Sequence, residues 1–333
     1  MQKATSQSTL VKIFFSLLLG GAILYWMYRD FDLSSVRQVM LHEMDWTWMW
    51  LSFPFGIMAQ VFRGWRWRQT LEPLGEEPRS STSVNAIFLS YAVSLVVPRI
   101  GEFARCGVLK RYDGVSFPKA LGTVVTERAI DTLLVLAITL LTFAYQFSAF
   151  DTFFATTGTN IAAILHSFTT TGYIVTAICG VAALLLVWYL LRTLQLQNKV
   201  KVTFNGLWQG VSSLTRVRNV PLFVAFTLAI WGCYFLHYYL TFFCFEATRG
   251  LGLSCALVTF IVGSIAVVVP TPNGAGPWHF AVKTMLILYG VADSAALSFV
   301  LIVHTVQTLL VVLLGVYAWI ALSLTQRNKT KQI

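Results

Sequence analysis

Charged side chains are scarce in this sequence of 333 residues, of which 11% are Asp, Glu, Lys or Arg and 56% are hydrophobic. Such scarcity excludes an ordinary soluble domain, which carries about 25% charged residues. Alternation of polar and apolar residues is also missing, and the continuously apolar runs exclude a membrane β-barrel. Together with a mean hydropathy of +0.69, these absences predict an all-α polytopic membrane protein.

Motifs for catalysis or metal binding are missing as well. The five cysteines show no CxxC and no Cys/His metal spacing. There is no GxSxG, no HExxH and no aspartate-rich prenyl-binding motif, and the hydrophilic loops are too short for a nucleotide-binding fold. We therefore expect no metal, no cofactor and no enzymatic activity. The first apolar run has no small-residue cleavage site after it and is expected to be a retained helix.

The net charge of +10 is explained by basic loops on the cytoplasmic side of a membrane, and not by binding of nucleic acid. The loop at 148–172 contains no Lys or Arg and is placed outside, whereas the basic loop at 192–218 is placed inside. We predict a single transmembrane domain (1–333) in the cell (inner) membrane, with six crossings and both termini cytoplasmic. The first predicted span ends near residue 28, and the second begins at residue 46. The other four cover about 129–147, 173–191, 221–245 and 295–324.

A charged stretch at residues 97–131 interrupts the apolar pattern. Ionisable groups at bilayer depth usually mark a functional path, although a cytosolic loop between two spans is the alternative interpretation. The apolar run before it, 84–97, has only 14 residues, whereas a spanning helix needs about 20. This favours a re-entrant hairpin at about 84–128, entered from the cytoplasmic side.

A second break, PTPNGAGP at 270–277, contains three prolines and two glycines and cannot continue a helix. The same topology makes 253–290 a hairpin entered from outside. Opposed broken helices are typical of secondary transporters, which hold substrate where the breaks meet. This step rests on analogy, since no sequence repeat is evident.

The first break supplies the main candidate site. Arg99, Glu102 and Arg105 have three-residue spacing, which places them near one helix face, where arginines at a helix start favour a phosphate. A structural ion-pair ladder among the three is the alternative. Glu127 and Asp131 lie one helical turn apart beside Arg128; a metal site is conceivable there, but the arginines would compete for the carboxylates.

Other candidates lie elsewhere in the chain. Arg63 and Arg66, among tryptophans, could anchor a helix at the interface or contact phosphate. His279 could present positive charge below its ordinary pKa of about 6.5, or merely hydrogen-bond a freed backbone carbonyl. The remaining candidates for substrate binding are Asn273 and Lys283, with the secondary pair His304 and Gln307 at i and i+3.

Three short segments of the sequence carry a resemblance. PRIGEFAR, followed by TERAID and the late PTPNGAG, resembles the membrane region of lysyl-phosphatidylglycerol synthases, also called the flippase-like domain family, here without the synthase domain. The resemblance covers about residues 10–324 and includes the RGWRWR stretch. It implies movement of a lipid between leaflets and points to Arg99, Glu102, Arg105, Glu127, Arg128 and Asp131. Where the family's second motif commonly ends in an acidic residue, this chain has His279.

The sequence thus predicts a flippase for a lipid with an anionic or zwitterionic headgroup, aminoacylated and glycan-linked lipids included. Two alternatives remain open. One is a membrane-embedded polyprenyl-phosphate or headgroup transferase using Glu102, Glu127 or Asp131 as acid or base. The other is a non-catalytic partner of a cell-envelope enzyme. A lipid-modifying enzyme is an expected partner of the flippase, and nucleic acid is not.

Overall fold

The computed structural model describes residues 18–29, 33–145, 212–269 and 271–330, with the isolated positions 205 and 208. Within these ranges every regular element is helical, which confirms the all-α prediction. The predicted span at 173–191, the loop at 148–172, most of the loop at 192–218 and the polar residues 1–12 lie outside the described residues.

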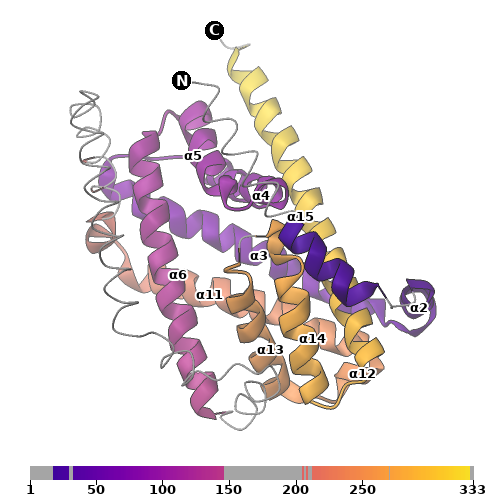
Figure 1. Ribbon diagram of the computed structural model, residues 1–333. Coiled ribbons are helices and arrows are strands. Elements are labelled where there is room, and N and C mark those ends of the chain that lie inside the picture. The colour runs from indigo at the N-terminus through magenta and orange to yellow at the C-terminus, as the bar shows by residue number, and fades with distance from the viewer. Residues whose placement is uncertain are drawn as a thin grey trace, which may run out of the picture.

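The long helices are joined by short helical turns (Figure 1). An N-terminal helix, Leu18–Tyr28, precedes the labelled elements. The α-helices are α2 (Leu33–Gln38), α3 (Trp46–Leu71), α4 (Ser80–Val96), α5 (Ile100–Asp113), α6 (Phe117–Tyr145), α11 (Val220–Tyr239), α12 (Glu246–Arg249), α13 (Gly252–Ala266), α14 (Pro277–Leu288) and α15 (Asp293–Thr330). The π- and 3₁₀-turns are η1 (Val39–Glu43), η2 (Glu72–Leu74), η3 (Ser213–Arg216), η4 (Leu240–Cys244) and η5 (Pro272–Gly274).

Helix α3 connects two hydrophobic cores. Its first half contributes Met49 to a core with residues of η4, α13, α14 and α15, among them Phe242 and Phe299. Its last turns contribute Trp67 and Leu71 to a second core with α4, α5 and α6. The two hairpins that contain the predicted breaks therefore contribute side chains to different cores.

The first break forms a helical hairpin of α4 and α5, which lie side by side (Figure 1). Pro98 ends the run, and Arg99 adopts a left-handed conformation (φ 65°) before α5 begins at Ile100. The two helices pack closely, since a Cβ added to Gly101 would lie 1.9 Å from the Ser90 carbonyl oxygen. The sequence predicted this break and the helix start after it.

The end of this hairpin differs from the predicted boundary at residue 128. Gly114 adopts a left-handed conformation and ends α5, and α6 then runs unbroken from Phe117 through residue 128 to Tyr145. Pro118 is tolerated because it lies in the first turn, where its missing N–H has no helical partner. Glu127 and Arg128 are thus on the long helix α6, and the span predicted from Ala129 begins twelve residues earlier.

The second break forms a similar hairpin of α13 and α14, close to the predicted limits 253–290. The two hairpin tips meet. The Arg99 guanidinium donates from Nη2 to the Val268 carbonyl oxygen at 3.0 Å, and α4 also packs against η5. The analogy with broken-helix transporters led us to expect such a meeting of the two breaks.

Two helical segments of the described chain are long and apolar enough to cross a bilayer by length and composition: Val220–Cys244, with 25 residues, and Asp293–Thr325, with 33. They correspond to the spans predicted at 221–245 and 295–324. Helix α4 is apolar but has only 17 residues, at the lower limit of a crossing.

Candidate functional site

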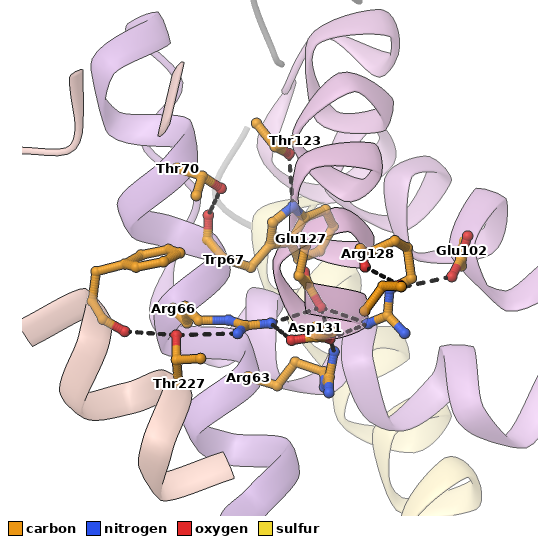
Figure 2. Close-up of polar contacts among 12 residues, drawn as sticks. Arg63, Arg66, Trp67, Thr70, Glu102, Thr123, Glu127, Arg128, Asp131 and Thr227 are labelled. Carbon is orange, nitrogen blue, oxygen red and sulfur yellow. Dashed lines mark hydrogen bonds and ion pairs between the residues drawn. The ribbon is translucent and has the colours of Figure 1, made fainter. Parts of the chain in front are cut away.

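A buried ion cluster joins α3 to α6. Arg63 and Arg66 lie one turn apart on α3, with side chains 3% and 1% exposed. Arg63 Nη1 lies 2.5 Å from Glu127 Oε1 and 2.7 Å from Asp131 Oδ2. Arg66 Nη2 lies 2.8 Å from Asp131 Oδ1, and its Nη1 donates to Thr227 Oγ1 of α11 at 3.2 Å. Figure 2 shows both arginines directed from α3 toward the two carboxylates of α6.

Helix α5 contributes Arg105 to the same cluster. Its Nη1 lies 2.9 Å from Glu127 Oε2, and its guanidinium carbon lies 4.7 Å from the centre of the Trp67 ring. Trp67 is itself fixed, because its indole N–H donates to Thr123 Oγ1 of α6 at 2.9 Å. Stacking on a fixed indole and pairing with a carboxylate hold the Arg105 guanidinium in one plane.

Arg128 connects the buried cluster with the surface. Its Nη2 lies 2.8 Å from Glu127 Oε1 and 3.2 Å from Asp131 Oδ2, yet its side chain is 41% exposed. On the outer side its Nε lies 3.5 Å from Glu102 of α5, whose side chain is 34% exposed. A ligand reaching the Arg128–Glu102 edge therefore meets a guanidinium that already contacts both buried carboxylates (Figure 2).

The cluster carries an excess of positive charge and of hydrogen-bond donors. Its four arginines exceed the carboxylates Glu102, Glu127 and Asp131 by one charge. Four buried donors have no hydrogen-bond partner among the described residues: Arg63 Nε, Arg66 Nε, Arg105 Nη2 and Arg128 Nε. Buried polar groups are normally satisfied, so these N–H groups are suited to donating hydrogen bonds to an anion with several oxygens.

The carboxylates of the cluster are poorly suited to proton transfer. Glu127 lies within 3.5 Å of four guanidinium groups, and Asp131 pairs with three. Each is thereby stabilised as an anion that supports the arginines. Within the described ranges, no three His, Cys, Asp or Glu side chains gather in an arrangement that could hold a metal ion.

The structure separates the three residues predicted to act together at the first break. Arg99 donates to Val268 in the other hairpin, Glu102 approaches Arg128, and Arg105 reaches Glu127. The structure gives no ion pair among the three, so Glu102 does not hold Arg99 or Arg105, and the alternative ion-pair ladder is not formed. Phosphate binding by the two arginines stays a prediction. The helical period does not apply to all three residues, because Arg99 lies before the first residue of α5 in a left-handed conformation.

Two candidates of the second hairpin, Asn273 and His279, contact polar residues of α15. Asn273 donates from Nδ2 to Thr308 Oγ1 at 2.8 Å, and its carbonyl oxygen lies 3.1 Å from His304 Nε2. His279 is 2% exposed, its ring centre is 4.5 Å from that of His304, and its Nδ1 accepts from the Gly276 N–H at 3.4 Å. His279 therefore bonds a backbone N–H group, and not the freed carbonyl oxygen that the alternative predicted.

The two remaining candidates make separate contacts. Lys283 forms an ion pair with Asp293 at 2.7 Å, and Gln307 donates to the His237 carbonyl oxygen at 3.3 Å. Neither joins the cluster around Glu127.

Sequence reasoning ranked Arg63 and Arg66 as secondary, yet they lie at the centre of the cluster. Their burial also argues against the interfacial-anchor interpretation. The sequence held a signal for this site: the two arginines are three residues apart and therefore lie on one helix face, and Glu127 and Asp131, four residues apart, lie on one face of another helix. Trp67 and Thr227 were not identified as site residues, because no sequence pattern indicates that the Trp67 ring lies against Arg105 or that the Thr227 hydroxyl contacts Arg66.

The helices and the cluster define an all-α membrane protein with a buried, cation-rich polar site. The chain belongs to the family described as the lysylphosphatidylglycerol synthase transmembrane region, whose family model matches residues 13–315. The comparisons found no match among curated proteins and no match among solved structures.

Proposed function

We propose that this protein is a lipid transporter that moves a phosphate-bearing lipid between leaflets, with the cluster around Glu127 and Asp131 as the headgroup site. The observation that carries the proposal is the set of four buried guanidinium N–H groups that make no hydrogen bond to the described residues, around two carboxylates that already pair with the arginines. A phosphate supplies several charged acceptors at once and matches the forked guanidinium donors. Membership of a membrane family whose name is tied to a phospholipid makes the lipid phosphate the natural ligand.

The half-exposed edge supports entry of a headgroup from one side. Arg128 and Glu102 lie at this edge, and the exposed Arg99 lies in the turn before α5. A phosphate contacting Arg128 is drawn toward the buried arginines, while Glu102 offers a contact for a positive group on a zwitterionic or aminoacylated headgroup. The same edge accepts glycan-linked lipid phosphates, so the headgroup class remains wider than one lipid.

The proposed arrangement in the membrane follows the sequence prediction. The chain is a single domain with six crossings, both termini on the cytoplasmic side of the cell membrane, and two hairpins entering from opposite faces. The meeting of the hairpin tips at Arg99 and Val268 supports this arrangement. A lipid-modifying enzyme that supplies the transported lipid is the proposed partner.

The transferase alternative receives less support. Acid or base catalysis requires a carboxylate free to exchange protons with substrate. Glu127 and Asp131 are each held by several guanidinium groups, and the half-exposed Glu102 lies beside Arg128. The geometry thus favours binding and release over bond formation.

The test is leaflet transfer by purified protein in liposomes. A fluorescent phosphatidylglycerol is the phosphate-bearing probe, and a fluorescent glycolipid without phosphate is the comparison probe. Arg128→Gln removes the entry guanidinium, and Arg105→Lys keeps the charge but removes the fork. Each loses at least one charge-assisted hydrogen bond, so we expect transfer of phosphatidylglycerol to fall by about tenfold or more.

Arg249→Gln is the matched control, since it removes an arginine whose side chain is 53% exposed and pairs only with Asp45 among the described carboxylates. Transfer by this variant is expected to equal that of wild type. Thermal stability measured beside transfer separates loss of function from loss of fold. Equal transfer in all variants would make the cluster purely structural, and a chemically altered headgroup in the recovered lipid would favour a transferase.

A further inference from the structure

The two hairpin tips share an uncommon backbone feature. Among the described residues that are not glycine, only Arg99 (φ 65°) and Asn273 (φ 52°) have positive φ, and each lies at one tip. A left-handed conformation is easy for Asn but unfavourable for Arg. Strained residues of this kind persist where surrounding contacts hold them, and they concentrate at clamps and switches.

The contact that Arg99 makes is a single bond across the two hairpins. Its Nη2 donates to the Val268 carbonyl oxygen at 3.0 Å, and the Arg99 side chain is exposed. A neutral carbonyl is a weaker acceptor for a guanidinium than a charged phosphate. An anionic ligand can therefore replace the Val268 carbonyl oxygen as the acceptor of this bond, which would separate the tips.

The second tip is held more firmly than the first. Asn273 is fixed to α15 through Thr308 at 2.8 Å and His304 at 3.1 Å, and Gly276 behind it approaches the N-terminal helix closely, at Gly20 and Ile23. Exposure is similar at the two tips, since Val96 of the first is 68% exposed and Val268 of the second is 65% exposed; the difference lies in these side-chain bonds of Asn273. If the tips separate, the α4–α5 tip is the side with fewer restraints.

We propose that the Arg99–Val268 contact is the latch of a gate formed by the two hairpin tips, and that the α4–α5 tip moves away when the latch opens. The trigger rests on the proposed function: a lipid phosphate competes with the Val268 carbonyl for the Arg99 guanidinium. Because the ligand contacts Arg99 only when the latch is released, it has a higher affinity for the open form and shifts the population toward it. The backbone strain at Arg99 favours release.

The test measures the distance between the tips. Spin labels at Val96→Cys and Val268→Cys report the distance between the tips by pulsed electron paramagnetic resonance. The labels are placed in a background without the five native cysteines. The Val268 substitution leaves its backbone carbonyl in place. Protein in maltoside detergent, which has no phosphate, is compared with the same sample after addition of short-chain phosphatidylglycerol or of a short-chain glycolipid.

Arg99→Met is the informative variant, because methionine has the same backbone penalty and a long side chain but no donor. We expect its ratio of open to closed tips in detergent alone to rise about tenfold over wild type, as for loss of one charge-assisted hydrogen bond. Lys110→Met removes an exposed cation from the other end of α5 and should leave the ratio unchanged. Phosphatidylglycerol should open wild type, and the glycolipid should not.

The two parts of the inference fail separately. An unchanged distance distribution in Arg99→Met overturns the latch, whatever the lipid does. Opening by Arg99→Met without any response of wild type to phosphatidylglycerol leaves the gate in place and overturns the phosphate trigger. The proposed cargo is decided separately, by the leaflet-transfer assay. Liposomes that transfer phosphatidylglycerol while the tips stay closed show a transport path that does not use this gate, which also overturns it.

Discussion

Replacement of Glu127 by Gln is the sharpest test of the buried cluster. The Glu127 side chain is 3% exposed and lies 2.5 Å from Arg63, 2.9 Å from Arg105 and 2.8 Å from Arg128. The variant keeps the size of the side chain and removes the charge that these guanidinium groups share. Glu127 is also the only carboxylate paired with Arg105 in the described chain, so Arg105 would be left buried without an ion-pair partner.

The expected cost follows from that geometry. Breaking a buried ion pair on one side destabilises a protein by about 3–5 kcal/mol, which is a large part of the roughly 5–15 kcal/mol that stabilises a typical domain. An amide side chain still accepts one hydrogen bond, so we expect the lower end, about 3 kcal/mol. The free energy of unfolding is measured in mixed micelles by titration with a denaturing detergent, followed by tryptophan fluorescence.

A double-mutant cycle with Arg105→Gln separates the pair from the rest of the cluster. Once both charges are gone, the two amides can pair, and the double variant should be less destabilised than the two single variants added together. The matched control is Asp45→Asn, which keeps the oxygen that accepts from the Thr47 N–H and breaks an exposed pair with Arg249 at 3.3 Å. This control should cost less than about 1 kcal/mol. A loss below 1 kcal/mol for Glu127→Gln, or strict additivity in the cycle, would refute a closed ion network.

Three further predictions address other parts of the molecule. Gly101→Ala should destabilise the α4–α5 hairpin strongly, because its Cβ would lie 1.9 Å from the Ser90 carbonyl oxygen. Gly107→Ala on the same helix is the control, since its Cβ would meet nothing within 4 Å and the change should be neutral or stabilising by up to about 1 kcal/mol. Equal melting temperatures for the two variants would contradict this packing. His279→Gln should leave the pH profile of transport unchanged, since the buried ring uses Nδ1 as an acceptor for the Gly276 N–H and keeps that role only when neutral; a pH dependence present in wild type and absent in the variant would restore the titration hypothesis. Cysteines placed at the exposed positions Glu77 and Lys110 should react with an impermeant reagent from the cytoplasmic face only, and labelling of Lys110→Cys from outside alone would overturn the re-entrant topology.

Local features of the sequence were enough to predict the class of fold and the places where helices break. Continuous apolar runs with little charge require helices whose backbone groups are satisfied internally. Pro98 and the stretch 270–277, rich in proline and glycine, cannot continue a helix, so the two breaks could be predicted from the sequence. That Glu127 and Asp131 lie on one helix face was likewise predictable, because they are four residues apart in a helix.

Tertiary packing decided which charges meet. Arg63 and Arg66 find Glu127 and Asp131 more than sixty positions away because α3 and α6 are brought together, and no local period encodes that choice. Packing also separated Arg99, Glu102 and Arg105, whose spacing had suggested one unit, by giving each a partner on a different element. The site therefore depends on an arrangement of helices that is selected by burial over the whole chain, whereas each helix end is set by a few adjacent residues.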